Sequence, residues 1–86
     1  DDYTYIFEGK TMINDVCKVM SLPGDIFEKV RGDSDSLAGL VLEIAGEFPQ
    51  VDVAVVSGDF TFITLAINKN RIDRVKVVIR KNPESN

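Results

Sequence analysis

The densest group of potential metal ligands in the sequence is the run DSDS at residues 33–36. Carboxylate and hydroxyl oxygens close together are typical of calcium loops, which place about six or more oxygens around one ion. A calcium loop that begins at Asp33 needs glycine at its sixth position and glutamate at its twelfth, but Ala38 and Ile44 stand there. The run also precedes an apolar periodic segment, where the same oxygens can cap a helix. We therefore interpret residues 33–36 as a helix start and predict no metal site.

Catalytic side chains are sparse in this sequence. Histidine, the commonest general base and transition-metal ligand, is absent, and Cys17 is the one cysteine. A thiol triad and a structural zinc site are therefore excluded. Cys17 falls on the apolar face of a predicted helix, so we expect a small buried hydrophobe rather than a reactive thiol. Asp15 and Asp25 could serve as general acid and base with another carboxylate, but their spacing does not single them out. We predict no catalytic residue and no cofactor, and we assign no ligand-binding residue.

The charged residues are unevenly distributed along the chain. Residues 1–68 carry 4 basic and 12 acidic groups, whereas residues 69–86 carry 6 basic and 2 acidic groups, within a net charge of −4. Such a basic cluster can contact phosphates or an anionic membrane, or it can form a solvated strand face that protects a sheet edge. We favour the strand face, and no nucleic-acid partner, because only two Tyr and no Trp are present for base stacking. The cluster comprises Lys69, Arg71, Arg74, Lys76, Arg80 and Lys81.

The length of 86 residues, with 44% hydrophobic residues, fits a single domain with one core. No apolar run approaches the roughly 20 residues that are needed to cross a bilayer. The lone cysteine fits a reducing compartment. Because the chain begins at Asp1 without a leading Met, we expect a domain excised from a larger protein. This domain spans residues 1–86, with an ordered core over about 3–80 and a frayed polar tail at 82–86.

A helix over residues 36–49 should organise the fold. Leu37, Leu40/Val41, Ile44/Ala45 and Phe48 recur at the spacing of one broad apolar stripe, which indicates a helix lying on a sheet. Pro49 marks its end. Gly39 and Gly46 follow alanines seven residues apart, which favours close packing on one side of the helix. A flexible helix, or Gly46 as a simple C-terminal cap, is the alternative.

The remaining segments alternate between strand and helix signals. Tyr3–Phe7 is rich in β-formers and predicts a strand, and residues 13–20 carry an apolar face with helical spacing. Residues 26–30 fit a short helical turn, a short strand or an irregular cover over the core. Three further strands are predicted at 51–56, 60–67 and 72–79, with turns at Gly58 and at residues 68–70. The predicted fold class is α+β, with helices packed on an antiparallel β-meander sheet.

The strand at 60–67 is apolar on both faces. Phe60 and Phe62 point to one side, and Ile63 and Leu65 point to the other. A sheet with helices on one side usually has a polar outer face. We therefore predict that either Phe60 and Phe62 or Ile63 and Leu65 form an interface with a second copy or a neighbouring domain. The alternative is that residues 26–30 cover the second face.

The order and wording of these motifs resemble the CorC/HlyC-type transporter-associated domain family over residues 3–80, and are most similar to its gliding-motility-associated branch. Ser36 and Ala38 replace the usual Thr and Gly, and Asp52 stands where Gly commonly begins the turn into the meander. The Asp35–Pro49 segment is the most specific part. The matching motifs are Gly9, Ile13-x-Asp15-Val16, Asp35-Ser36-Leu37-Ala38-Gly39-Leu40-Val41-Leu42-Glu43, Pro49, Gly58 and Arg71-Ile72-x-x-Val75-x-Val77.

This resemblance implies a context that the residues alone do not. Such domains lie at the C-terminal end of integral membrane proteins, after a membrane region and a pair of CBS modules, on the cytoplasmic side of the inner membrane. Their fold is similar to FAD-binding domains of the vanillyl-alcohol oxidase type, without an evident flavin site. Their implied role is non-catalytic modulation of magnesium or cobalt transport, or of gliding motility, through contacts with the CBS and membrane domains.

Two other functions remain open at this point. A small ligand such as a nucleotide or a flavin fragment could bind between helix and sheet near Gly39 and the Gly58 turn, which would make the domain a sensor. Alternatively, the domain could serve only for homodimerisation. An enzyme is the least favoured reading.

Overall fold

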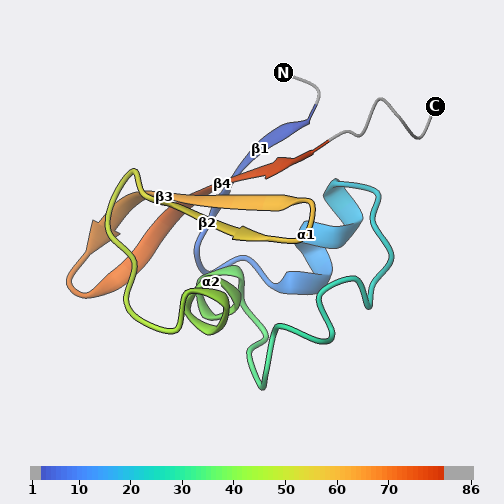
Figure 1. Cartoon of the computed structure of the whole chain (residues 1–86), viewed down its shortest axis with the longest axis horizontal. Coiled ribbons are helices and arrows are strands. Elements are labelled where there is room, and N and C mark those ends of the chain that lie inside the picture. Colours follow the sequence, from blue (N-terminus) through green and yellow to red (C-terminus); the bar gives the residue numbers. More distant parts are fainter. Residues whose placement is uncertain (1–2, 81–86) are drawn as a thin grey trace.

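The computed structural model describes residues 3–80 (Figure 1) and has α+β architecture. Its strands form a four-stranded antiparallel sheet in the order β1-β4-β3-β2. Both helices lie on the same side of this sheet. The predicted fold class is therefore confirmed, whereas Lys81 and the tail expected at 82–86 lie outside the described residues. The elements are β1 (Thr4–Glu8), α1 (Ile13–Val19), α2 (Leu37–Ala45), β2 (Ala54–Ser57), β3 (Phe60–Asn68) and β4 (Arg71–Ile79).

Two tight turns connect the last three strands. Ser57 pairs with Phe60 across one two-residue turn, where Gly58 has a φ of 58°. The second turn is Lys69-Asn70, with φ values of 53° and 64°. Positive φ at both central residues is typical of the type I′ turn, whose twist matches that of the flanking strands. The predicted meander is thus confirmed, and β1 extends it by pairing antiparallel with β4 at the sheet edge.

The meander begins later than predicted. Residues 51–53 were expected to open the strand, but β2 starts at Ala54. The reason lies at Asp52, which adopts a φ of 69° and donates its backbone N–H to the Thr64 carbonyl at 2.8 Å. A left-handed residue cannot continue an extended strand. Asp52 thus adopts a left-handed conformation that glycine takes more readily.

Helix α2 has a defined cap at each end. The Ser36 side chain accepts a hydrogen bond from the Gly39 N–H at 3.1 Å, which satisfies one of the free donors of the first turn. Gly46 ends the helix with a φ of 75° and donates its N–H to the Leu42 carbonyl. Because this cap comes early, Phe48 lies beyond the helix and is 44% exposed, so its predicted place in the apolar stripe is wrong. Three stripe residues are fully buried: Leu37, Leu40 and Val41.

The two glycines of α2 have different surroundings. A Cβ at Gly39 would lie 2.7 Å from the Ser34 Oγ and 2.8 Å from its Cβ, so this glycine permits a close approach of the preceding loop. A Cβ at Gly46 would meet nothing within 4 Å. The requirement at Gly46 is therefore its left-handed backbone, as in the simple-cap alternative, and close packing explains Gly39 alone.

An irregular segment covers the aromatic part of the core. Residues 26–30 form hydrogen-bonded turns without a regular helix or a strand, so the short-strand alternative is wrong. The Phe27 carbonyl accepts from the Val30 and Arg31 N–H groups at 3.0 and 2.9 Å. The Phe27 ring packs edge-on against Phe60, with ring centroids 4.8 Å apart, and against Phe62 at 6.0 Å. Edge-to-face pairs of this kind add about 0.5–1.5 kcal/mol beyond their buried area. Phe27 therefore anchors the long connection between α1 and α2 to the sheet.

Thr64 leads to a prediction about stability. Its side chain is 1% exposed, and its hydroxyl makes no hydrogen bond. A buried hydroxyl without a partner costs about 1–3 kcal/mol. We expect Thr64→Val, which keeps the branched shape and removes the hydroxyl, to raise the free energy of unfolding by about 1 kcal/mol. Urea denaturation measures the change; equal or lower stability of the variant would show that the hydroxyl is satisfied in solution.

Candidate functional site

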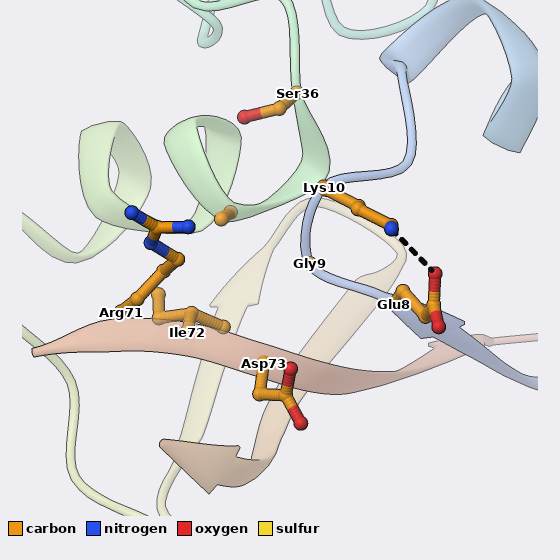
Figure 2. A pocket seen from close by; sticks show the side chains of 8 residues that line it. Glu8, Gly9, Lys10, Ser36, Arg71, Ile72 and Asp73 are labelled. Carbon is orange, nitrogen blue, oxygen red and sulfur yellow. Dashed lines mark ion pairs between the residues drawn. The ribbon is translucent and has the colours of Figure 1, made fainter. Parts of the chain in front are cut away.

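An open hollow of about 450 Å³ lies where β1 ends and where α2 and β4 begin (Figure 2). The sheet forms its floor, and the first turn of α2 forms one wall. Four charged side chains surround it, two basic and two acidic. The hollow is lined by Glu8, Gly9, Lys10, Ser36, Ala38, Arg71, Ile72 and Asp73.

Gly9 ties the three elements of the hollow together. Its N–H donates to the Asp73 carbonyl at 2.9 Å, and its carbonyl accepts from the Ala38 N–H at 2.9 Å. A Cβ at this position would collide with the Ile72 carbonyl oxygen and would lie 3.3 Å from the Ala38 Cβ. The backbone of β1 thus passes so close to β4 and α2 that only glycine fits. The sequence marks Gly9 as part of the matching motifs, but its pattern does not reveal this contact.

The charges of the hollow balance one another. Lys10 Nζ lies 3.8 Å from a Glu8 carboxylate oxygen, and both side chains are largely exposed. Arg71 extends from the start of β4 toward α2, and Asp73 lies on the same strand (Figure 2). Two cations and two anions give no net attraction for an anionic or a cationic ligand. Charge alone therefore does not select a ligand for this hollow.

The first backbone donors of α2 are already used within the chain. The Leu37 N–H donates to the Thr11 carbonyl at 2.8 Å, the Ala38 N–H donates to Gly9, and the Gly39 N–H donates to Ser36. Anion sites at helix starts require these N–H groups to be free. The hollow therefore lacks the donors that bind phosphate at helix starts.

The ligand site considered between Gly39 and Gly58 is not formed as one cavity. Gly58 lines a separate hollow against residues 25–30, which shares no lining residue with the hollow at the start of α2. Gly39 faces Ser34 instead of a cavity. The structure thus separates the two glycines that the small-ligand hypothesis brings together.

The acidic run before α2 takes part in local structure. Ser36 caps the helix, and the Asp35 carbonyl accepts the Ile13 N–H at 2.7 Å. Arg31 donates to the Ser34 carbonyl at 2.9 Å and to an Asp35 carboxylate oxygen at 3.2 Å. In the part of the chain that the structure describes, no group of three or more Asp, Glu, Cys or His residues could hold a metal ion.

Cys17 lies on the buried face of α1 and belongs to the core. Its side chain is 1% exposed, and burial raises the pKa of the thiol; nearby Arg31 opposes the rise and Asp25 adds to it. A raised pKa keeps the sulfur protonated at neutral pH, and the thiolate is the nucleophilic form. Cys17 therefore packs as a small hydrophobe, in agreement with its position on the apolar face.

The predicted interface residues fall on opposite faces of the sheet. Phe60 and Phe62 are 8% and 0% exposed and pack under Phe27, so a surface role for these two residues is wrong. They lie on the helix side of the sheet, where Phe62 pairs with buried Val77 and Phe60 pairs with half-buried Ile79. Ile63 is half-buried and lies on the other side of β3, opposite Lys76. Leu65 is also half-buried and falls at the irregularity in the β3–β4 register between Thr64 and Ala66.

We call this second side the outer face. It carries the outward residues of all four strands, and within residues 3–80 no helix lies on it (Figure 1). The residues of the outer face are Thr4, Ile6, Glu8, Ala54, Val56, Thr61, Ile63, Ala66, Arg74, Lys76 and Val78. Arg74 and Lys76 of the basic cluster therefore lie on a strand face, whereas Arg71 lines the hollow.

No helix within residues 3–80 is long and apolar enough to span a membrane.

The chain matches the family model described as "Transporter associated domain" (CorC_HlyC) over residues 1–81. No curated protein matches it significantly. Among solved structures, it is 36% identical to the transporter-associated domain from a CBS domain protein of Porphyromonas gingivalis. That match covers 93% of this chain and 92% of the other, with a TM-score of 0.84.

Two more distant structures share the fold. The putative Mg²⁺ and Co²⁺ transporter (CorC) associated region from Neisseria meningitidis MC58 is 16% identical, covers 92% of this chain and 91% of that one, and has a TM-score of 0.73. The CorC_HlyC domain of a Xylella fastidiosa Temecula1 hemolysin, in complex with Mg²⁺ and Mn²⁺, is 15% identical. It covers 91% of this chain and 89% of that one, with a TM-score of 0.71. At these identities the likeness concerns the fold.

We predict that this domain has no specific divalent-cation site. Tight binding of Mg²⁺ or Ca²⁺ requires about six or more converging oxygens, and residues 33–36 contribute to capping and to contacts with Arg31 instead. Isothermal titration of the domain with magnesium, calcium, manganese or cobalt should therefore give only dilution heat. A stoichiometric binding curve with a Kd below about 100 µM would contradict the prediction, because it requires a preorganised site.

Proposed function

Because the chain belongs to the CorC_HlyC transporter-associated domain family, we propose that it is a non-catalytic regulatory domain of a CBS-containing membrane transport protein. The observation that carries this proposal is the 36% identity to the Porphyromonas gingivalis domain over 93% of the chain. That relative is described as part of a CBS domain protein. The domain would thus act through contacts with neighbouring modules, and the buried, protonated Cys17 supports a non-catalytic role.

The proposal for the transported ion rests on a more distant relative. The Neisseria meningitidis relative is named for magnesium and cobalt transport, and its identity to this chain is 16%. We propose a divalent cation as the transported species and the cytoplasmic side of the inner membrane as the location. The narrower assignment to the gliding-motility branch stays a prediction. The hollow at the start of α2 does not favour the small-ligand alternative, because its helix donors are already used.

Transport by the full-length protein that carries this domain provides the test. Cells that express the protein with and without residues 1–86 are compared for magnesium and cobalt flux across a range of external concentrations. We expect the shortened protein to reach the membrane but to show a several-fold change in flux or in its dependence on ion concentration. A membrane blot verifies equal amounts of the two proteins. Identical flux curves at equal amounts would contradict a regulatory role.

A further inference from the structure

The outer face of the sheet is unusually apolar for a solvated surface. The cross-strand register places Ile6 and Ile63 on either side of Lys76, and Thr61 between Val56 and Val78. Ile6 is 57% exposed and Val56 is 64% exposed. Contiguous exposed apolar patches are uncommon on monomeric proteins and usually mark interaction sites. The outer face is therefore a candidate binding surface, and its charges indicate what it binds.

The charges of this face are mainly basic. Lys76 lies between the two isoleucines and is half-buried, so its aliphatic stem covers part of the apolar surface. No carboxylate within residues 3–80 forms an ion pair with it. Arg74 follows on the same strand and is exposed, with Glu8 opposite it on β1. The centre of an apolar face thus presents an ammonium group that pairs with no carboxylate of the described residues 3–80.

A complementary surface must be apolar and must carry a carboxylate opposite Lys76. A second copy fits poorly, because a face-to-face dimer brings the two basic centres together, and like charges across an interface are costly. An anionic bilayer also fits poorly, because the chain as a whole has a net charge of −4. The binding partner that remains is another part of the full-length protein that carries this domain. This inference rests on the proposed function. We propose that the outer face binds an acidic, apolar surface of that full-length protein, with a carboxylate paired to Lys76.

Thiol labelling tests whether the outer face is covered. Ile6→Cys lies on the outer face, and Val19→Cys on α1 is a matched control, because the native side chains are 57% and 58% exposed. Native Cys17 is buried and serves as an internal reference. In the 86-residue chain we expect a maleimide to label both introduced cysteines at similar rates. In the full-length protein we expect labelling of Ile6→Cys to slow at least tenfold, while Val19→Cys keeps its rate.

A charge reversal tests the carboxylate partner. In the full-length protein, Lys76→Glu should restore most of the labelling rate of Ile6→Cys, because it places like charges in contact. Lys76→Arg should preserve the protection. Lys18→Glu on α1 is the control for a general change in charge and should have no effect. Unchanged protection in the Lys76→Glu variant would overturn the pairing.

A measurement on the protein without substitutions avoids any effect of misfolding in the variants. Acylation of lysines by an amine-reactive ester, followed by mass spectrometry, gives the ratio of Lys76 to Lys18 modification in both chains. The ratio should fall at least fivefold in the full-length protein. Equal ratios, together with equal labelling of Ile6→Cys in both chains, would overturn the proposal.

The alternative occupants give distinct results. Protection of Ile6→Cys that grows with the concentration of the 86-residue chain would assign the face to a second copy. Protection of that chain by phosphatidylserine vesicles would assign it to a membrane. Either result overturns the proposal. The flux comparison is independent: unchanged flux with a protected outer face would refute regulation while leaving the docking intact.

Discussion

Gly9→Ala should destabilise the fold by about 3 kcal/mol, at the upper end of the usual cost of overpacking. The added Cβ would collide with the carbonyl oxygen of Ile72, which is backbone and cannot rotate away. Relief requires β1 to move from β4, and this movement stretches the hydrogen bonds of Gly9 to Asp73 and Ala38. Gly9 does not have a positive φ, so the expected loss arises from lack of space. Urea denaturation followed by circular dichroism measures the change.

Gly24→Ala is the matched control. A Cβ at Gly24 would meet nothing within 4 Å, and the residue does not have a positive φ. The free energy of unfolding of Gly24→Ala should differ from that of the native chain by less than about 1 kcal/mol. A small gain is expected because alanine reduces the conformational freedom of the unfolded chain. If the two alanine variants were equally stable, the junction of β1, β4 and α2 would be looser than this structure describes.

Phe62→Ala is the second large effect, with an expected cost of about 3–5 kcal/mol. The ring is 0% exposed and packs against Phe27 and Phe60, so truncation leaves a cavity in the centre of the core. A chain of 86 residues has a total stability of about 4–13 kcal/mol, so the variant retains only part of it. Thermal and urea denaturation should both show the loss.

The opposite face provides the comparison for this prediction. Ile6→Ala removes an apolar side chain that is 57% exposed, so its cost in the 86-residue chain should stay below about 1 kcal/mol. A similar loss for Phe62→Ala and Ile6→Ala would mean that both faces of the sheet are covered in solution. In that case the assignment of inner and outer faces would need revision.

The elements with strong periodicity could be predicted from sequence. Leu37, Leu40 and Val41 repeat at helical spacing, and their burial depends mainly on this local pattern. Where a single residue interrupts a pattern, prediction failed: Asp52 adopts a left-handed conformation that composition alone does not reveal. Phe48 was misplaced for the same reason, because the cap at Gly46 takes precedence over the apolar spacing.

Contacts between distant segments were not predictable in the same way. Alternation along β3 separates Phe62 from Ile63, but it does not say which side the helices cover. On the buried side, Phe62 packs against Phe27, which lies in a segment without periodicity. The contact of Gly9 with Ile72 joins opposite ends of the chain, and the candidate hollow follows from it. A sequence pattern shows which side chains share one face of a helix or strand. Which other segment packs on that face depends on tertiary contacts.

The pairing of β1 with β4 also determines how the chain folds. The two hairpins of the meander close through two-residue turns, whereas Glu8 and Arg74 pair across nearly the whole chain. Loop closure costs about 0.6 kcal/mol for each doubling of length, or about 3 kcal/mol more for this pairing than for a hairpin. We expect β1 to join after the folding barrier has been crossed. Phe7→Ala should therefore accelerate unfolding and leave the folding rate unchanged, whereas slower folding of this variant would place β1 in the nucleus.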